Sequence, residues 1–252
     1  MNESTSKKLV AEAKHSFNKL LRIPEYKTII FDDTQRKRLI ELLRVQPKGS
    51  YLDLATGTGY VGFAIAEQYT GCSVEGLDIA NEVIIENRNK VKEQTLANID
   101  FKIFDGIKFP DFDTKFNGVV CRYALHHFPE IGLTLKEISR VLKNGGRVVI
   151  SDAIKNKYDN EDFINKFQGL KADGHVKMYT RHEMLNLFKN NDFTEVESFN
   201  SKITFLRELN PKYKKLLQFT SQEIKNIYSA AVSDNKVSLT FNILNIAFTK
   251  RS

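Results

Sequence analysis

The chain has 252 residues, of which 41% are hydrophobic, and it carries a formal net charge of +7. A chain of this length and apolar content can bury one core with a small appended lid, so we expect a single domain over residues 1–252. No segment approaches the roughly 18 to 20 consecutive apolar residues of a membrane helix, and the polar start of the chain lacks the apolar core of a signal peptide. These observations predict a cytoplasmic protein without membrane insertion.

The positive charge raises the question of a nucleic-acid partner. The 38 Lys and Arg are interspersed with 31 Asp and Glu, and Lys outnumbers Arg. No Arg-rich run with interleaved aromatic residues appears. The pattern therefore favours a solvated, Lys-rich surface and a small-molecule partner over a site for nucleic acid.

The two cysteines, Cys72 and Cys121, stand in apolar stretches and show no C-x-x-C spacing. This arrangement argues against a disulfide framework and against structural zinc. We expect two buried thiols and no bound metal.

Two amphipathic helices are predicted at the start of the chain. Apolar residues recur at helical spacing from Leu9 to Leu20, and Pro24 ends the pattern. A second helix begins near residues 33–34, where an Asp and a Thr can cap it, and reaches about residue 43. Residues 1–46 are therefore expected to form an N-terminal helical cap.

From residue 51 onward, short apolar strands alternate with helical patterns. Such alternation is typical of a parallel sheet with helices on both faces, so we expect a doubly wound α/β fold. The predicted strands cover 51–55, 73–79, 100–105, 116–124 and 146–154, and the helices between them cover 59–69, 81–94 and 133–143.

The regular alternation of strands and helices ends after residue 152. Segments 153–180 and 205–235 are predicted lid insertions. Capping boxes are predicted at Thr180 with Glu183 and at Thr220 with Glu223. The last strand is expected to enter the sheet differently from the others. The elements predicted here are a helix near 163–170, a loop over 171–180, a helix from 180, a strand at 193–199, a helical region from 210 and a last strand at 238–248.

The stretch "YLDLATGTGYVG", residues 51–62, fits two kinds of ligand-binding turn. Gly57, Gly59 and Gly62 spell the G-x-G-x-x-G of a dinucleotide site. Asp53, however, lies in the strand four residues before Gly57, where its carboxylate would repel a pyrophosphate in a desolvated cleft. A carboxylate there suits S-adenosylmethionine, which carries a sulfonium and an ammonium and has no phosphate.

Two further acids follow the next two strands. Asp78 ends the second strand, 21 residues after Gly57, where a carboxylate can accept both hydroxyls of a ribose. Asp105 follows the third strand, where an acceptor could meet the amino group of an adenine. The alternative for Asp53, Asp78 and Asp105 alike is an ordinary turn or helix-capping aspartate.

These residues resemble the class I S-adenosylmethionine-dependent methyltransferases, especially the ubiquinone/menaquinone-biosynthesis branch, over roughly residues 49–193. The motifs that carry the resemblance are "YLDLATGTGYVG", "VEGLDIA", "DGIKFPDFDTKFNGVVCRYALHHFPE" and "LKEISRVLKNGGRVVISDA". The resemblance implies seven strands, the last antiparallel, and S-adenosyl-L-methionine as methyl donor. The chain departs from the family at Ala55, where a glycine is frequent, and we expect the turn to survive this added methyl group.

The resemblance also implies the residues of the site. In "CRYALHHF" the candidate catalytic residues are His126 and His127, of which at most one can face the cleft if the chain is extended there, since consecutive side chains alternate. The alternative is that both histidines pack beneath the lid. The expected cofactor-binding residues are Asp53, Ala55, Gly57, Thr58, Gly59, Asp78, Ile79, Asp105, Gly106 and Arg122, and the expected substrate-binding residues are Tyr26, Tyr123, His175 and Tyr179.

The function expected from this resemblance is methyl transfer to an O, N or C nucleophile of a small molecule. Enzymes that methylate amino groups of nucleic-acid bases often carry Asn/Asp-Pro-Pro-aromatic after the fourth strand, and this chain does not. Two alternatives stay open at this point: an RNA or protein methyltransferase that uses the basic surface, and a non-catalytic protein that binds an adenosyl ligand.

Overall fold

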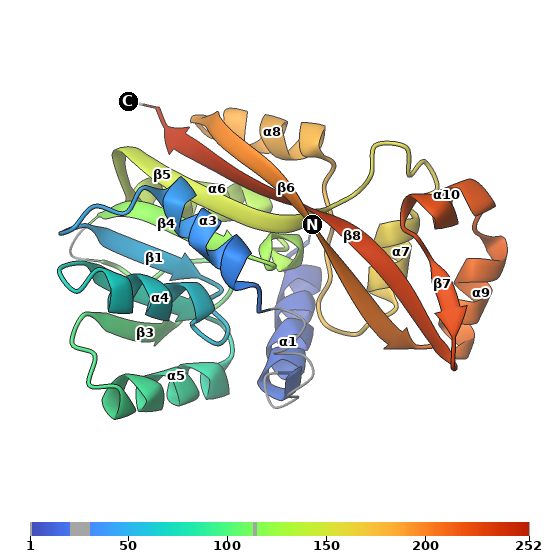
Figure 1. The fold of residues 1–252 in the computed structure, drawn as a ribbon, viewed down its shortest axis with the longest axis horizontal. Helices are drawn as coiled ribbons and strands as arrows, with labels where there is room; N and C mark the ends of the chain where they lie inside the picture. The colour runs from blue at the N-terminus through green and yellow to red at the C-terminus, as the bar shows by residue number, and fades with distance from the viewer. Residues whose placement is uncertain (1, 21–30, 113–114, 252) are drawn as a thin grey trace.

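The computed structural model describes residues 2–20, 31–112 and 115–251. Within these residues, one mixed sheet has the strand order β3-β2-β1-β4-β5-β8-β6, and a short β7 pairs with β8. The first five strands are mutually parallel, and β8 runs antiparallel to β5 and β6 (Figure 1). The strands are β1 (Ser50–Leu54), β2 (Ser73–Asp78), β3 (Ile99–Ile103), β4 (Phe116–Arg122), β5 (Leu142–Ile154), β6 (Phe193–Glu208), β7 (Ala231–Ser233) and β8 (Lys236–Lys250).

Helices cover both faces of the sheet, which confirms the doubly wound α/β prediction. One apolar cluster joins β1, β4, β5 and β8 to α6 and α8, and a second joins the opposite face to α3 and α4. The helices are α1 (Glu3–Leu20), α3 (Asp33–Leu43), α4 (Tyr60–Gln68), α5 (Asn81–Glu93), the 3₁₀ turn η1 (Leu125–His127), α6 (Ile131–Val141), α7 (Phe163–Gly169), α8 (Arg181–Lys189), α9 (Pro211–Phe219) and α10 (Gln222–Ile227).

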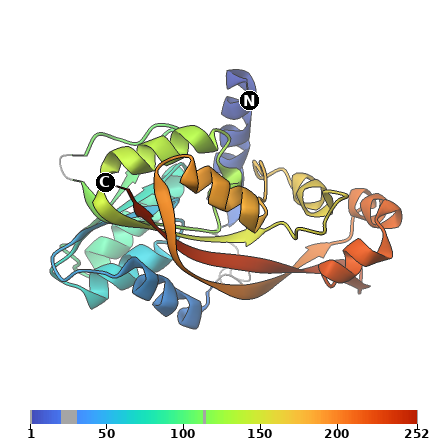
Figure 2. The ribbon, with the colours of Figure 1, turned by 90° about the horizontal axis from the view of Figure 1, so that it is seen from above.

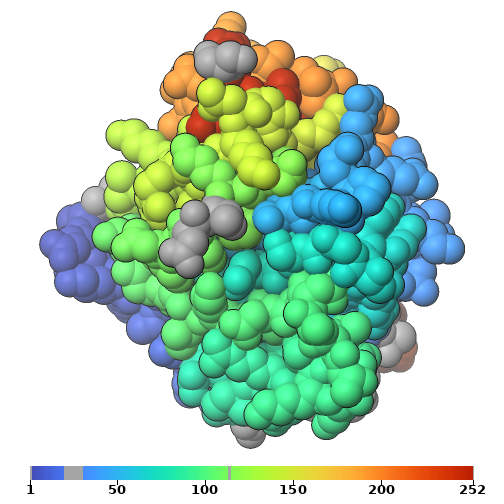
Figure 3. All heavy atoms as spheres, turned by 90° about the vertical axis from the view of Figure 1, so that its left-hand side faces the viewer, coloured from blue at the N-terminus to red at the C-terminus, as the bar shows by residue number. Residues whose placement is uncertain are grey.

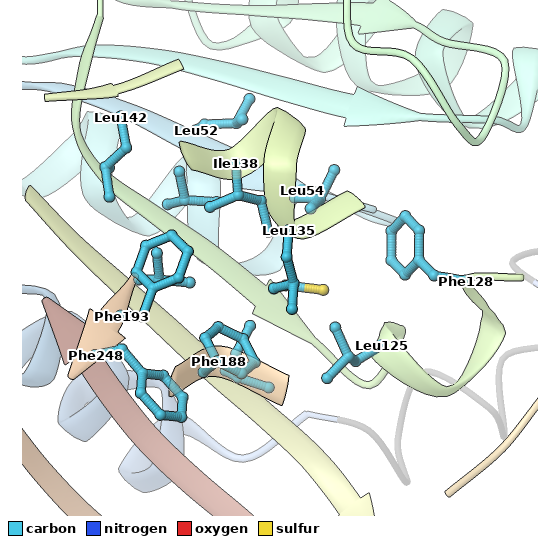
Figure 4. Close-up of a cluster of buried hydrophobic side chains, with 14 of the residues drawn as sticks. Leu52, Leu54, Leu125, Phe128, Leu135, Ile138, Leu142, Phe188, Phe193 and Phe248 are labelled. Atoms are coloured by element: carbon cyan, nitrogen blue, oxygen red, sulfur yellow. The ribbon is translucent and has the colours of Figure 1, made fainter. Parts of the chain in front are cut away.

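The cluster beneath α6 shows how the sheet is held (Figure 4). Leu54 of β1 and Leu135 of α6 are both fully buried, and burial of such a side chain contributes roughly 1.5–3 kcal/mol. Phe188 of α8 stacks on Phe248 of β8 with ring centroids 4.0 Å apart. This packing fixes the parallel strands in register, so that their carboxyl ends meet at one edge.

β6 and β8 continue past the parallel strands as a long two-stranded ribbon (Figure 2). The face of this extension is covered by α7, α9 and α10 around a third apolar cluster that includes Phe167 and Phe241. β6 reaches Glu208, so residues 205–208 of the predicted insertion at 205–235 belong to the sheet. The antiparallel entry of β8 confirms the expectation that the last strand is inserted differently.

The helix caps agree with the sequence in one case and differ in two. The capping box of Thr180 and Glu183 is present at α8. The box predicted at Thr220 and Glu223 is wrong: Ser221 caps α10, while the Thr220 hydroxyl donates to the Leu216 carbonyl at 2.8 Å. α3 is capped by Asp32, the residue before the predicted pair at 33–34, because its extended backbone aims the carboxylate at the Gln35 N–H, three positions later.

Both cysteines are buried free thiols, as predicted. In the described ranges, no helix combines the length and the apolar character that crossing a membrane requires. Figure 3 looks at the end where the parallel strands begin, and the molecule presents a convex face there. The cleft described below lies at their opposite ends.

Candidate functional site

A cleft lies between α1 and the carboxyl ends of β1, β2 and β4. It encloses about 1020 Å³ including its open mouth. Most of the predicted cofactor-binding residues line it, although Gly59 and Asp105 do not. The predicted residues that do are Asp53, Ala55, Gly57, Thr58, Asp78, Ile79, Gly106 and Arg122.

The glycine turn between β1 and α4 forms the floor of the cleft. Ala55 has a φ of 54° and Gly57 a φ of 52°, both in the left-handed region that favours glycine. The turn therefore survives the alanine, at a cost of roughly 1–2 kcal/mol for an L-residue in this conformation. At Gly62 a Cβ would lie 3.0 Å from an Asp53 carboxylate oxygen, so the third glycine of the motif allows α4 to approach β1 closely.

Asp53 is a buried carboxylate at the methionine end expected for the cofactor. Its Oδ2 accepts hydrogen bonds from the Thr56 hydroxyl at 2.6 Å and the Gly62 N–H at 2.9 Å. Burial, with a smaller contribution from the neighbouring Asp78, raises the pKa of Asp53 to about 7. A cation in the cleft would relieve this cost and a phosphate would increase it, so the site fits the sulfonium and ammonium of S-adenosylmethionine.

Asp78 at the end of β2 links the glycine turn to the second strand. It accepts the Gly57 N–H at 2.9 Å and the Ala80 N–H at 3.0 Å. Burial raises the pKa of this carboxyl as well. The Ile79 N–H is a third backbone donor to this carboxylate, which as an acceptor-only group can still accept a hydrogen bond from a ribose hydroxyl.

The structure places Asp105 differently from the sequence prediction. Its side chain is exposed, and Oδ1 accepts the backbone N–H groups of Ile107 at 2.8 Å and Lys108 at 2.7 Å. This is the turn-capping role, and it leaves the carboxylate outside the cleft because the chain reverses direction here. Gly106, with a φ of 87°, and Phe104 take its place in the wall.

Arg122 ends β4, Tyr123 follows it, and both line the cleft with Tyr60. The Arg122 guanidinium lies 4.1 Å from the Tyr123 ring centroid and 5.1 Å from that of Tyr60. Burial lowers the pKa of Arg122 and raises that of Tyr123. Tyr60 was missed by sequence reasoning, although its place directly after Gly59 could have indicated it.

The two adjacent histidines have different surroundings. They lie in the 3₁₀ turn η1, so the premise of an extended chain is wrong, and their ring centroids are only 4.2 Å apart. His127 lines the cleft, whereas His126 is bound to Asp152 through Nδ1 at 2.7 Å and through its backbone N–H at 3.0 Å. Burial lowers the pKa of His127 well below its usual value, with a further contribution from His126.

His175 and Tyr179, two of the predicted substrate-binding residues, do not line the cleft. His175 lies behind the histidine pair, 5.7 Å from the His126 ring, with Nε2 at 3.1 Å from Asn165 Oδ1. Burial lowers the pKa of His175 to about 4. Tyr179 packs against the apolar cluster beneath α6, and Tyr26 lies outside the described residues. Within the described ranges, no three His, Cys, Asp or Glu side chains are grouped to hold a metal ion.

The helix α1 supplies a wall that sequence reasoning did not place. Val10, Ala13 and Phe17 line the cleft, and the Phe17 ring meets the His127 ring edge-on at 5.1 Å. The apolar repeat of this helix predicted a buried face but not its partner. In the structure this face of α1 lines the cleft.

The sheet order, the acid-flanked glycine turn and the cleft define a Rossmann-like methyltransferase fold. Residues 46–231 match the family described as methyltransferase domain, and the chain belongs to this family. The uncharacterized methyltransferase YcgJ of Bacillus subtilis is 25% identical over 174 residues, 66% of each chain. Its crystal structure superposes with a TM-score of 0.74 at 21% identity, covering 88% of this chain and 100% of YcgJ.

Two further proteins are similar over shorter shares of their length. A demethylmenaquinone methyltransferase of Alkalihalophilus pseudofirmus is 32% identical over 116 residues, 45% of this chain and 49% of that protein. Phosphoethanolamine N-methyltransferase 2 of Haemonchus contortus, solved with S-adenosyl-L-methionine, has a TM-score of 0.60 at 16% identity, covering 87% of this chain and 53% of the other. The chain thus spans about half to two thirds of the curated relatives it matches.

Proposed function

We propose that this protein transfers a methyl group from S-adenosyl-L-methionine to an O, N or C nucleophile of a small molecule. The observation that carries the proposal is the pair of buried carboxylates, Asp53 and Asp78, on either side of the glycine turn in one cleft. Membership of the methyltransferase domain family supports the donor, and the similarity to demethylmenaquinone methyltransferases supports a small acceptor.

In this proposal, different residues of the cleft bind different parts of the cofactor. Asp53 and the turn at Gly57 hold the methionine end, and Asp78 accepts the ribose hydroxyls. Ile79 and Gly106 flank the adenine. When bound, the cofactor supplies an electrophilic methyl group, and the chain aligns the acceptor with it while α1 keeps water out.

His127 is the proton acceptor in this mechanism. Its ring lines the cleft, a hydrogen bond joins it to the backbone of Gly174, and its buried Nδ1 has no partner among the described residues. Burial lowers the pKa of His127 and keeps its imidazole neutral, so Nδ1 can accept a hydrogen bond from the methyl acceptor, although as a weaker base than an exposed imidazole. His126, bound to Asp152, holds η1 in place.

Isothermal titration calorimetry with S-adenosylmethionine, S-adenosylhomocysteine and NAD tests the donor. We expect binding of the two adenosyl ligands and none of NAD. Mass spectrometry of ligands that copurify with the protein provides an independent check. The absence of binding to either adenosyl ligand, or preferential binding of NAD, would refute the proposal.

A further inference from the structure

Gln35, in the first turn of α3, is the centre of a polar network behind the cleft. Its side chain is buried, with 3% of its surface exposed. The carboxamide oxygen accepts Arg122 Nε–H at 2.9 Å and the Tyr123 hydroxyl at 3.2 Å. The amide nitrogen contacts the Ser201 hydroxyl at 3.1 Å and Asn245 Oδ1 at 3.2 Å. Gln35 therefore joins Arg122 at the end of β4, and Tyr123 after it, to the far strands of the sheet.

The same turn of α3 holds a third cleft residue. The Tyr60 hydroxyl donates to Asp33 at 2.6 Å, and the Arg36 guanidinium lies 4.4 Å from the Tyr60 ring centroid. Arg122 contacts both tyrosine rings, so its guanidinium is restrained by two aromatic faces and by the bond to Gln35. A planar guanidinium restrained in this way is held in one orientation.

The charged residues of the cleft indicate which ligand group the Arg122 guanidinium would bind. Among the described residues that line the cleft, Arg122 is the sole Lys or Arg, and it faces the same space as Asp53. The methionine portion of the proposed cofactor carries an ammonium and a carboxylate. A carboxylate matches the guanidinium fork, as the ammonium matches Asp53.

We infer that Arg122 binds the carboxylate of the methionine portion and that Gln35 is the positioning residue that orients Arg122 for it. This inference rests on the proposed function, since it assigns one group of the proposed cofactor. It also assigns a role to α3: the first turn of this helix assembles the carboxylate subsite from behind. Gln35 itself does not line the cleft.

Two ligands separate this role from a general effect on the fold. S-Adenosylhomocysteine has the carboxylate, and its decarboxylated analogue keeps the adenosine, the sulfur and the amine. Met fills the volume of Gln35 without its hydrogen bonds. We expect Gln35→Met to bind S-adenosylhomocysteine about tenfold more weakly and the analogue with unchanged affinity, as measured by calorimetry.

The chain offers a matched control in Gln168. This second buried glutamine, on α7, also accepts a hydrogen bond from an arginine, Arg207, and lies outside the cleft. Gln168→Met should leave both affinities unchanged. Arg122→Met should weaken S-adenosylhomocysteine roughly 10- to 150-fold, and adding Gln35→Met to it should have no further effect, because the two residues act in series.

A second variant keeps the test valid if Gln35→Met does not fold. Gln35→Glu keeps an acceptor for Arg122 Nε–H but places a competing negative charge beside the guanidinium, so it should weaken S-adenosylhomocysteine and spare the analogue. Equal loss for both ligands, or no loss for either, would overturn the inference in both variants. If the unmodified protein binds neither ligand, the proposed function itself fails, which is a different result.

Discussion

The raised pKa of Asp53 predicts that cofactor binding depends on pH in a way that reports the sulfonium. With a pKa of about 7, about nine-tenths of Asp53 is ionised at pH 8 and about 3% at pH 5.5. If the ionised form alone attracts the ammonium and the sulfonium of the cofactor, the affinity for S-adenosylmethionine falls by about 30-fold between these pH values. S-Adenosylhomocysteine keeps the ammonium but has a neutral sulfur, so its affinity should fall less.

The comparison of the two ligands cancels the other groups in the cleft. Asp78 and Arg122 meet the same ribose and the same carboxylate in both complexes, and His127 is neutral in both. Calorimetric titrations at pH 5.5 and pH 8 should therefore show a steeper decline for S-adenosylmethionine. Asp53→Asn should remove the difference, because the amide does not titrate. Equal slopes for the two ligands, or a steep slope that persists in Asp53→Asn, would refute this reasoning.

The same carboxyl has a consequence for the free protein. Its folded-state pKa lies above the value of 3.8 expected in the unfolded chain, so the charged form destabilises the fold. The penalty is absent below about pH 3.8, grows as the pH rises and is complete above about pH 7, where it reaches about 4 kcal/mol. Denaturant unfolding should show Asp53→Asn gaining stability over the unmodified protein across this range. A constant difference would contradict the assigned pKa.

Further predictions concern the other parts of the site. Asp78→Ala should weaken S-adenosylmethionine by about 1.5–3 kcal/mol in calorimetry, and an unchanged affinity would exclude the ribose role. His127→Ala should lower turnover roughly 10² to 10⁴-fold at constant cofactor affinity once an acceptor is known, whereas His126→Ala should lower the thermal midpoint; full activity of His127→Ala would leave alignment as the whole mechanism. Gly174→Ala places a Cβ 2.4 Å from the Leu9 carbonyl oxygen at a φ of 73°, so it should displace α1 and weaken cofactor binding. Hydrogen exchange should slow in segments 153–180 and 205–235 when ligands bind, and equal protection in both states would count against a lid.

The two acids that carry the proposed function could be found from the sequence because of the geometry of parallel sheets. Asp53 is the second-last residue of β1 and Asp78 is the last residue of β2. The carboxyl ends of neighbouring parallel strands lie at the same edge of the sheet. Asp105 also follows a strand, yet its carboxylate caps a local turn. An aspartate that binds a ligand and an aspartate that caps a turn both follow a strand in the sequence. Only the path of the backbone beyond the strand distinguishes the two roles.

The histidine pair shows the same limit. The prediction from the sequence placed His126 and His127 after β4 and considered an extended chain there. In the structure, a 3₁₀ turn brings their rings together instead. Which ring faces the cleft depends on Asp152, 26 positions later in the chain, because its carboxylate captures His126. The role of Gln35 has the same origin, since its partners come from β4, β6 and β8.

The sequence by itself determined the alternation of strands and helices, the parallel core, the glycine turn and the sign of the charge beside it. These features depend on periodicity, on local backbone preferences and on residues close together in the chain. The tertiary structure decided which face of α1 closes the cleft, which histidine borders it and which buried amide orients Arg122. Those contacts join residues far apart in the chain, and side-chain packing selects them in three dimensions with no local signal in the sequence.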